Sequence, residues 1–173
     1  SGLTGMIVRI IIIRNLTIVK GESMTFHYMV MANHAIYNKV LMEILEDSGL
    51  TAGQPKVLDY LKEHDGSNQK EIARACFLEA GSLTSILNRM EEKGLVERRM
   101  LNGNRRSFHV FLTENGKKNQ ELVEEMFAEI EKDALDGISS EEFETFMEVY
   151  RKIYGNLLQA ERKTEKEGKM KNE

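Results

Sequence analysis

Hydrogen-bonding and cationic side chains gather in residues 79–106, EAGSLTSILNRMEEKGLVERRMLNGNRR. Within the first half, Leu83, Ile86, Leu87 and Met90 recur at helical spacing and predict one buried stripe. Away from that stripe lie side chains that are short or can form hydrogen bonds: Ser82, Thr84, Ser85, Asn88 and Arg89. Such side chains can approach base edges in the major groove, and Arg89 also suits a phosphate. We therefore predict a recognition helix over residues 80–94 that reads double-stranded DNA.

The second half of this stretch has the pattern of a two-stranded hairpin with a basic tip. Residues 95–99 have strand character, residues 101–104 (LNGN) favour a turn, and residues 107–112 return as a second strand. The resulting wing, residues 99–107, supplies three further DNA-binding candidates, Asn104, Arg105 and Arg106. We expect the two arginines to reach the DNA backbone or the adjacent minor groove. The alternative, for helix and wing alike, is an ordinary solvated surface.

The composition allows one buried core with a helical extension. The chain has 173 residues, of which 41% are hydrophobic and 30% charged, with one proline and no tryptophan. Few strand-favouring aromatics are present, so mostly helix is expected. The net charge of −4 argues weakly against nucleic acid. However, residues 51–112 carry ten Lys/Arg against eight Asp/Glu, whereas residues 113–173 carry ten against sixteen. A mildly basic centre therefore precedes an acidic C-terminal part.

The flanking segments predict long helices. Residues 24–47 have the apolar periodicity of an amphipathic helix. Three pairs have capping-box spacing and predict helix starts: Thr51 with Gln54, Asn68 with Glu71, and Ser139 with Glu142. In the last helix the apolar side chains follow a spacing near 3.5 residues, which is typical of a coiled coil. The charged end from about Glu161 is expected to fray unless a neighbour holds it.

We expect four parts along the chain. Residues 1–23 form a tag or leader: SGLTG resembles a cloning remnant, and the apolar run 6–19 is too short to span a bilayer. Lys20-Gly21-Glu22 can be encoded by a purine-rich run resembling a ribosome-binding site, so we hypothesise that Met24 is the native start. Residues 49–112 form the winged-helix DNA-binding domain. Residues 24–48 and 113–160 form a helical dimerisation region, and residues 161–173 a charged tail.

A homodimer is expected because both flanking helical segments carry more apolar surface than a central module of this size can cover. Their apolar faces are therefore predicted to meet across a two-fold axis.

Other chemistry is sparse. Cys76 is the single cysteine, which excludes an intramolecular disulfide and favours a reducing, cytoplasmic setting. Its place on the apolar side of a short helix predicts a buried structural thiol instead of a redox sensor. His27 and His34 share one face of the first helix but lack a surrounding ligand cluster, so no metal site is predicted. A ligand pocket lined by Phe26, His34 and Tyr37 is the more plausible role for this face.

No phosphate loop, nucleophile elbow or zinc-hydrolase motif occurs in the sequence. We therefore predict no enzyme activity, no cofactor and no membrane partner.

Five motifs, in order and correctly spaced, resemble the MarR-type (multiple antibiotic resistance regulator) winged-helix transcription factors between about residues 24 and 158. They are Leu50-Thr51-x-x-Gln54, Lys70-Glu71-Ile72-Ala73, LTSILNRMEEKGLVER at residues 83–98, Asn104-Arg105-Arg106-Ser107 and Leu112-Thr113-Glu114-Asn115-Gly116. The resemblance implies a mainly α fold with a small β-hairpin wing (α+β), in which a winged helix-turn-helix core carries N- and C-terminal dimerisation helices. It also implies an obligate bacterial dimer on a pseudo-palindromic operator, commonly released when a small-molecule effector or an oxidant is sensed.

Two positions depart from the family pattern. The wing usually carries an aspartate where Asn104 stands, paired with the arginine two residues on, and Asn104 can offer Arg106 a hydrogen bond but no charge. Oxidation-sensing members have a cysteine in the first helix, and this chain has none there.

The sequence thus predicts a dimeric DNA-binding regulator that acts as a repressor. Its two recognition helices are expected to lie about 34 Å apart, which matches one turn of DNA. The rival interpretation is a winged-helix adaptor module that binds protein instead of DNA. It is favoured by the negative total charge and by Glu79, Glu91 and Glu92 on or beside the recognition helix.

Overall fold

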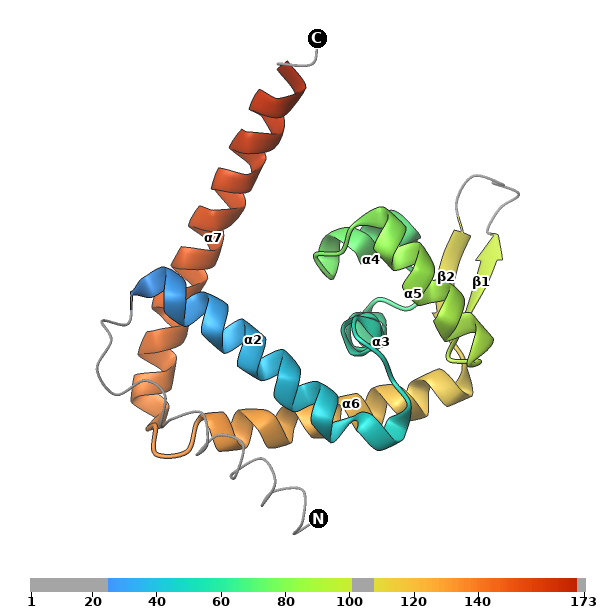
Figure 1. The fold of residues 1–173 in the computed structure, drawn as a ribbon, viewed down its shortest axis with the longest axis horizontal. Helices are drawn as coiled ribbons and strands as arrows, with labels where there is room; N and C mark the ends of the chain where they lie inside the picture. Colours follow the sequence, from blue (N-terminus) through green and yellow to red (C-terminus); the bar gives the residue numbers. More distant parts are fainter. Residues whose placement is uncertain (1–24, 101–107, 171–173) are drawn as a thin grey trace. The chain divides into compact units, whose positions relative to one another are not determined.

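The computed structural model describes residues 25–100 and 108–170, apart from the side chains of residues 165–170. The chain divides into two compact units, Ser1–Ala134 and Leu135–Glu173. The described part of the first unit contains, in order, α2 (Phe26–Ile44), η1 (Glu46–Ser48), α3 (Gln54–Glu63), α4 (Gln69–Ala75), α5 (Ala80–Glu92), β1 (Val96–Met100), β2 (Phe108–Leu112) and α6 (Glu114–Ala134) (Figure 1). The predicted mainly helical fold with one hairpin is confirmed.

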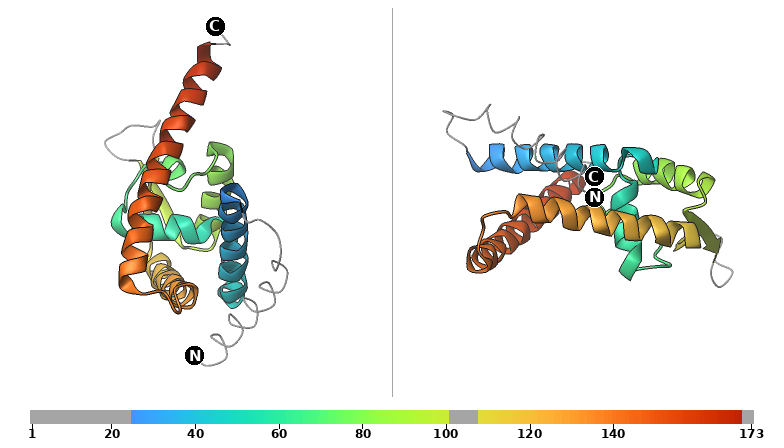
Figure 2. Two further views of the ribbon diagram at one scale, coloured as in Figure 1. Left: turned by 90° about the vertical axis from the view of Figure 1, so that its left-hand side faces the viewer. Right: turned by 90° about the horizontal axis from the view of Figure 1, so that it is seen from below.

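Helix α3 lies at the centre of the first unit. It packs against α4, α5, β2 and α6, and α2 runs alongside α6 (Figure 2). The side chains that fill the space between these elements are fully buried: Leu58, Leu61, Ile72, Leu83, Leu87, Met90 and Val110. The predicted apolar stripe of α5 is thus inside this core, so the opposite side of α5 must face outward.

The hairpin is antiparallel, with Val96 opposite Leu112 and Met100 opposite Phe108. Val96 and Val110 point into the core. The outer edge of β2 pairs with residues 66–68, where the Gly66 N–H donates to the Val110 carbonyl at 2.9 Å and the Val110 N–H donates to the Ser67 carbonyl at 3.0 Å. The sequence predicted only a turn here, and this extra pairing anchors the hairpin to the segment before α4.

Two helix starts confirm the capping pattern and one corrects it. Asn68 accepts from the Glu71 N–H at 3.0 Å and Glu71 accepts from the Asn68 N–H at 2.9 Å. At the second helix, however, Thr51 is not the cap: α3 begins at Gln54 after Gly53. Only the Gln54 half of the box forms, with its Oε1 accepting from the Thr51 N–H at 2.9 Å. Pro55 explains the later start, because a helix capped by Thr51 would need a hydrogen bond from the Pro55 nitrogen to the Thr51 carbonyl, and proline has no N–H to donate.

Helix α5 ends in a Schellman motif. Gly94 adopts φ 63°, its N–H donates to the Glu91 carbonyl at 2.9 Å, and the Leu95 N–H donates to the Met90 carbonyl at 2.8 Å. A left-handed residue at this position favours glycine, which has no Cβ. The chain turns at once into β1.

Helix α6 begins against this same corner. The Thr113 hydroxyl donates to the Gly94 carbonyl at 2.5 Å and accepts from the Gly116 N–H at 2.9 Å, so Thr113 caps α6 and ties it to the end of α5. Gly116 is buried, and a Cβ there would lie 1.9 Å from the Leu95 carbonyl oxygen. Only glycine allows this approach.

The second unit contains α7 (Ser140–Met170), described here by itself. Its start is capped as predicted: Ser139 Oγ accepts from the Glu142 N–H at 3.3 Å, and Glu142 accepts from the Ser139 N–H at 2.9 Å. The expectation that the chain frays from about Glu161 was wrong, since the helix continues to Met170. Glutamate, lysine and arginine are good helix formers, and their high proportion here favours continuation of the helix. None of the described helices is long and apolar enough to cross a membrane.

Gly116→Ala is predicted to destabilise the first unit by about 3 kcal/mol or more, because the added Cβ meets backbone that cannot rotate away. Gly81→Ala is the matched control: the added Cβ would have nothing within 4 Å, so stability should stay equal or rise by up to about 1 kcal/mol. Urea unfolding followed by circular dichroism measures both changes. Equal midpoints for Gly116→Ala and wild type would show that α6 does not need this contact.

Candidate nucleic-acid interface

The predicted recognition helix, α5, presents its polar set to solvent. Leu83, Ile86, Leu87 and Met90 are buried. All five predicted contact residues are exposed: Ser82, Thr84, Ser85, Asn88 and Arg89. The structure therefore brings these five residues onto the outer surface of one helix, as their spacing indicated.

The hydroxyl groups on this surface are partly engaged by their own helix. Thr84 Oγ1 donates to the Ala80 carbonyl at 2.9 Å, and Ser85 Oγ donates to the Gly81 carbonyl at 3.3 Å. A hydroxyl that donates in this way keeps its acceptor lone pairs. Thr84 and Ser85 can therefore accept from a base amino group without leaving their present rotamers.

Each residue of an α-helix is rotated by about 100° from the one before it. On α5, Ser85 and Asn88 therefore point nearly opposite to the buried stripe. Ser82 and Arg89 lie toward one edge of the exposed surface, and Glu91 lies toward the other. The amide of Asn88 can donate and accept at once, which is the pattern that adenine presents in the major groove.

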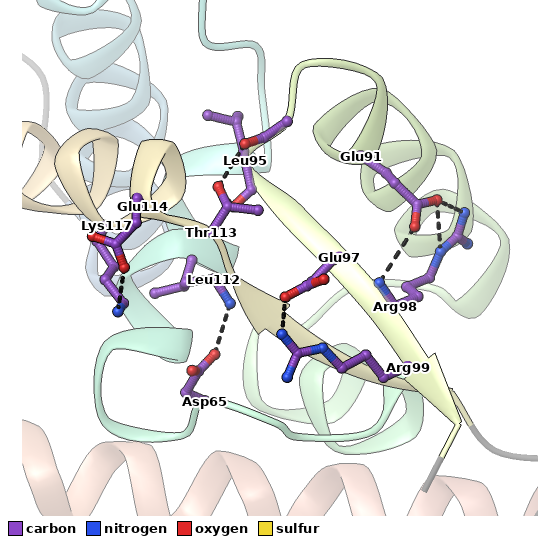
Figure 3. A network of polar contacts seen from close by, with 11 residues as sticks. Asp65, Glu91, Leu95, Glu97, Arg98, Arg99, Leu112, Thr113, Glu114 and Lys117 are labelled. Atoms are coloured by element: carbon purple, nitrogen blue, oxygen red, sulfur yellow. Dashed lines mark hydrogen bonds and ion pairs between the residues drawn. The ribbon is translucent and has the colours of Figure 1, made fainter.

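The Glu91 edge faces the hairpin and carries an ion pair (Figure 3). Arg98, on β1, donates to Glu91 Oε2 from Nε at 3.1 Å and from Nη2 at 2.5 Å, and its backbone N–H lies 3.3 Å from Glu91 Oε1. The hydrogen bonds and positive charge of Arg98 hold the pKa of Glu91 below its usual value. No sequence pattern indicates this pair, because its partners lie on a helix and a strand, where no fixed spacing marks a contact.

Arg99 lies on the other face of β1. It forms an ion pair with Glu97, and its guanidinium lies 4.8 Å from the centre of the Phe111 ring (Figure 3 shows the ion pair). The Arg99 side chain remains 55% exposed. The remaining wing candidates, Asn104, Arg105 and Arg106, lie outside the described residues.

The predicted ligand-binding face of α2 is open within the first unit. Phe26 is 56% exposed and His34 is exposed, with its ring 3.2 Å from the Asn38 amide nitrogen. Tyr37 is half-buried, with its ring centre 6.3 Å from that of Phe127, and burial raises its pKa. Across the described residues, no cluster of three or more His, Cys, Asp or Glu side chains could hold a metal ion.

Cys76 is buried, as predicted, at the end of α4. Its Sγ lies 3.5 Å from the Lys56 carbonyl oxygen, and burial raises the pKa of the thiol to about 11. Since the thiolate is the reactive form, this environment makes the thiol poorly nucleophilic.

A helix-turn-helix with an outward polar helix, followed by a hairpin anchored to it, defines a winged helix-turn-helix protein. Residues 48–107 match the sequence model of the MarR family. This match includes α5 and β1 and agrees with the resemblance of the motifs to MarR-type winged-helix proteins.

Solved structures of transcriptional regulators share the fold. A MarR transcriptional regulator from Methanosarcina mazei Go1 is 22% identical over 77% of this chain and 98% of its own, with a TM-score of 0.69. The transcriptional regulator PA3341 is 27% identical over 78% of this chain and 99% of its own, with a TM-score of 0.71. MepR of S. aureus, solved in a complex with DNA, is 28% identical over 78% of this chain and 97% of its own, with a TM-score of 0.68.

Cys76 should react slowly with a disulfide reagent in the native protein. With a pKa of about 11, the thiolate fraction at pH 8 is roughly 0.1%, and the rate should rise with pH toward that value. Absorbance of the released thiolate from Ellman's reagent measures this reaction at the single cysteine, and the urea-unfolded chain is the reference. Native labelling as fast as unfolded labelling would contradict the structural role.

Proposed function

We propose that the chain is a dimeric DNA-binding transcriptional regulator that represses from a pseudo-palindromic operator. Each subunit would place the recognition helix, residues 80–94, in the major groove, and the wing, residues 99–107, on the backbone or minor groove. The observation that carries the proposal is the exposed set on α5, Ser82 to Arg89, directly opposite a fully buried stripe. The DNA complex of the 28% identical MepR supports it.

The charge of the module makes a dimer necessary for tight binding. Residues 51–112 carry ten cationic side chains against eight acidic ones, so one copy attracts DNA weakly. Two copies whose recognition helices lie about 34 Å apart would contact successive major grooves on one side of the duplex. Affinity would then depend on how firmly the two copies are held together.

Exposed apolar side chains on α2 and α7 support self-association. On α7, large apolar residues are exposed at near-heptad spacing: Phe143, Phe146, Val149, Tyr150, Tyr154 and Leu157. On α2 the exposed set is Phe26, Tyr28, Met29, Val30, Met31 and Ile36. Such a density of exposed apolar surface on two helices marks an interaction site. We propose that a second copy of the chain covers it.

We place the effector site along α2, at Phe26, His34 and Tyr37. Phe26 and His34 are exposed, so a ligand can reach this face of α2 from solvent. A ligand that prefers one spacing of the recognition helices would then shift the equilibrium between DNA-binding and released forms.

The chain should give a sequence-specific mobility shift with DNA from upstream of its own gene. Asn88→Ala should retain binding at low salt but lose discrimination at one base pair of each half-site, with a cost of about 1–3 kcal/mol at that position. Competition with operators mutated one base pair at a time measures this loss. If wild type produces no specific shift at low salt, the adaptor interpretation replaces the regulator.

Arg106→Ala should weaken binding to all sequences alike, because a phosphate contact carries no base information. The slope of log affinity against log salt should fall by about one unit per arginine, hence about two for a dimer. Arg106→Lys should keep that slope. Lys132→Ala is the control: it removes the same charge at the far end of α6, about 27 Å along the helix from Glu114. An unchanged slope for Arg106→Ala would remove this residue from the interface.

A further inference from the structure

Besides the core packing of Val96 and Val110, polar contacts among the described residues attach the hairpin to the rest of the first unit in three regions. At its base, the Thr113 N–H donates to the Leu95 carbonyl at 3.1 Å. Along the outer edge of β2, residues 66–68 pair with His109 and Val110. On the β1 side, the polar contact to α5 is the ion pair between Arg98 and Glu91 (Figure 3). Two of the three attachments therefore lie at the base or on β2, and one lies on β1.

The position of the third attachment gives it a mechanical role. Arg98 is the middle residue of β1 (Val96–Met100), two residues beyond the core side chain Val96. Because β2 is held along its outer edge and Val96 lies in the core, the part of β1 beyond Val96 is the least anchored part of the described hairpin. The contact of Arg98 with Glu91 restrains this part of β1 against α5.

The geometry of the pair suits this role. Three nitrogen atoms of Arg98, two from the guanidinium and one from the backbone, meet the two oxygens of one carboxylate. Multiple hydrogen bonds from a planar guanidinium fix direction as well as distance. The side chains are 22% exposed for Arg98 and 40% exposed for Glu91, so the pair is more shielded than an ordinary surface pair.

We propose that Glu91 and Arg98 are positioning residues that set the angle between the recognition helix and the wing, so that both engage DNA together. This role rests on the proposed function in DNA binding. Neither side chain needs to touch a base. Their effect is on the angle between α5 and β1.

The direction in which one substitution changes operator affinity separates a positioning role from a simple charge effect. Glu91→Gln removes a negative charge beside the DNA-facing surface, which by electrostatics alone should tighten binding to a polyanion. If Glu91 holds the wing through Arg98, the same substitution should weaken operator binding by about 3–10-fold despite the more favourable charge. Glu92→Gln is the matched control, because Glu92 is the adjacent exposed carboxylate and forms no ion pair with a described residue. It should bind operator as tightly as wild type, or more tightly.

The experiment combines two readouts on the full-length chain. Hydroxyl-radical footprinting at saturating protein should show that Glu91→Gln loses protection at the flanking minor grooves and keeps it around the major-groove contacts. Hydrogen exchange on the free protein should show faster exchange in residues 96–112 for Glu91→Gln and Arg98→Gln, with little change in thermal midpoint. The reversed pair, Glu91→Arg with Arg98→Glu, should recover part of both signals.

The positioning role is overturned if the Glu91→Gln variant binds operator as tightly as the Glu92→Gln variant does. It is also overturned if hydrogen exchange in residues 96–112 is the same in Glu91→Gln as in wild type. A uniform loss of protection together with a lower thermal midpoint overturns it as well, because that result shows general destabilisation. If wild type itself fails to bind operator specifically, the proposed function falls, and the hydrogen-exchange result then reports only on the attachment of the hairpin.

Discussion

The corner where α5, the hairpin and α6 meet is the constraint on which the rest of the first unit depends. Gly94 reverses the chain in a left-handed conformation, and Thr113 hydrogen-bonds back to it while capping α6. Gly116 lets α6 approach the Leu95 carbonyl closely enough that a Cβ would lie 1.9 Å from its oxygen. The first turn of α6 is therefore locked to the end of the recognition helix, with little space for independent movement.

This lock has a consequence for any signal that reaches the recognition helix. A shift of α6 at its first turn must carry the Gly94–Leu95 corner with it, and α5 and β1 both start or end there. A packed corner of this kind moves as one body, because close-packed backbone is not continuously deformable. An effector acting on the long helices would thus reorient helix and wing together without unfolding either.

Sequence patterns predicted most of what depends on local chemistry. The buried stripe of α5 and the caps at Asn68 and Ser139 each follow from a few neighbouring residues. Thr51 was assigned wrongly as a cap because Pro55 displaces the start of α3. The end of α7 was assigned wrongly because charge suggested disorder although the residue types favour helix. The pairing of residues 66–68 with β2 and the Glu91–Arg98 contact involve distant segments, so no local pattern could reveal them.

The Glu91–Arg98 pair also changes how the charge of the interface is interpreted. In the sequence, the acidic residues at the end of α5 argue against DNA binding and favour the adaptor interpretation. In the folded chain, Arg98 neutralises Glu91 on the edge that faces the wing, so the acidic count overstates the repulsion there. The same contact joins the middle of β1 to the end of α5, so it acts on the hairpin beyond its base.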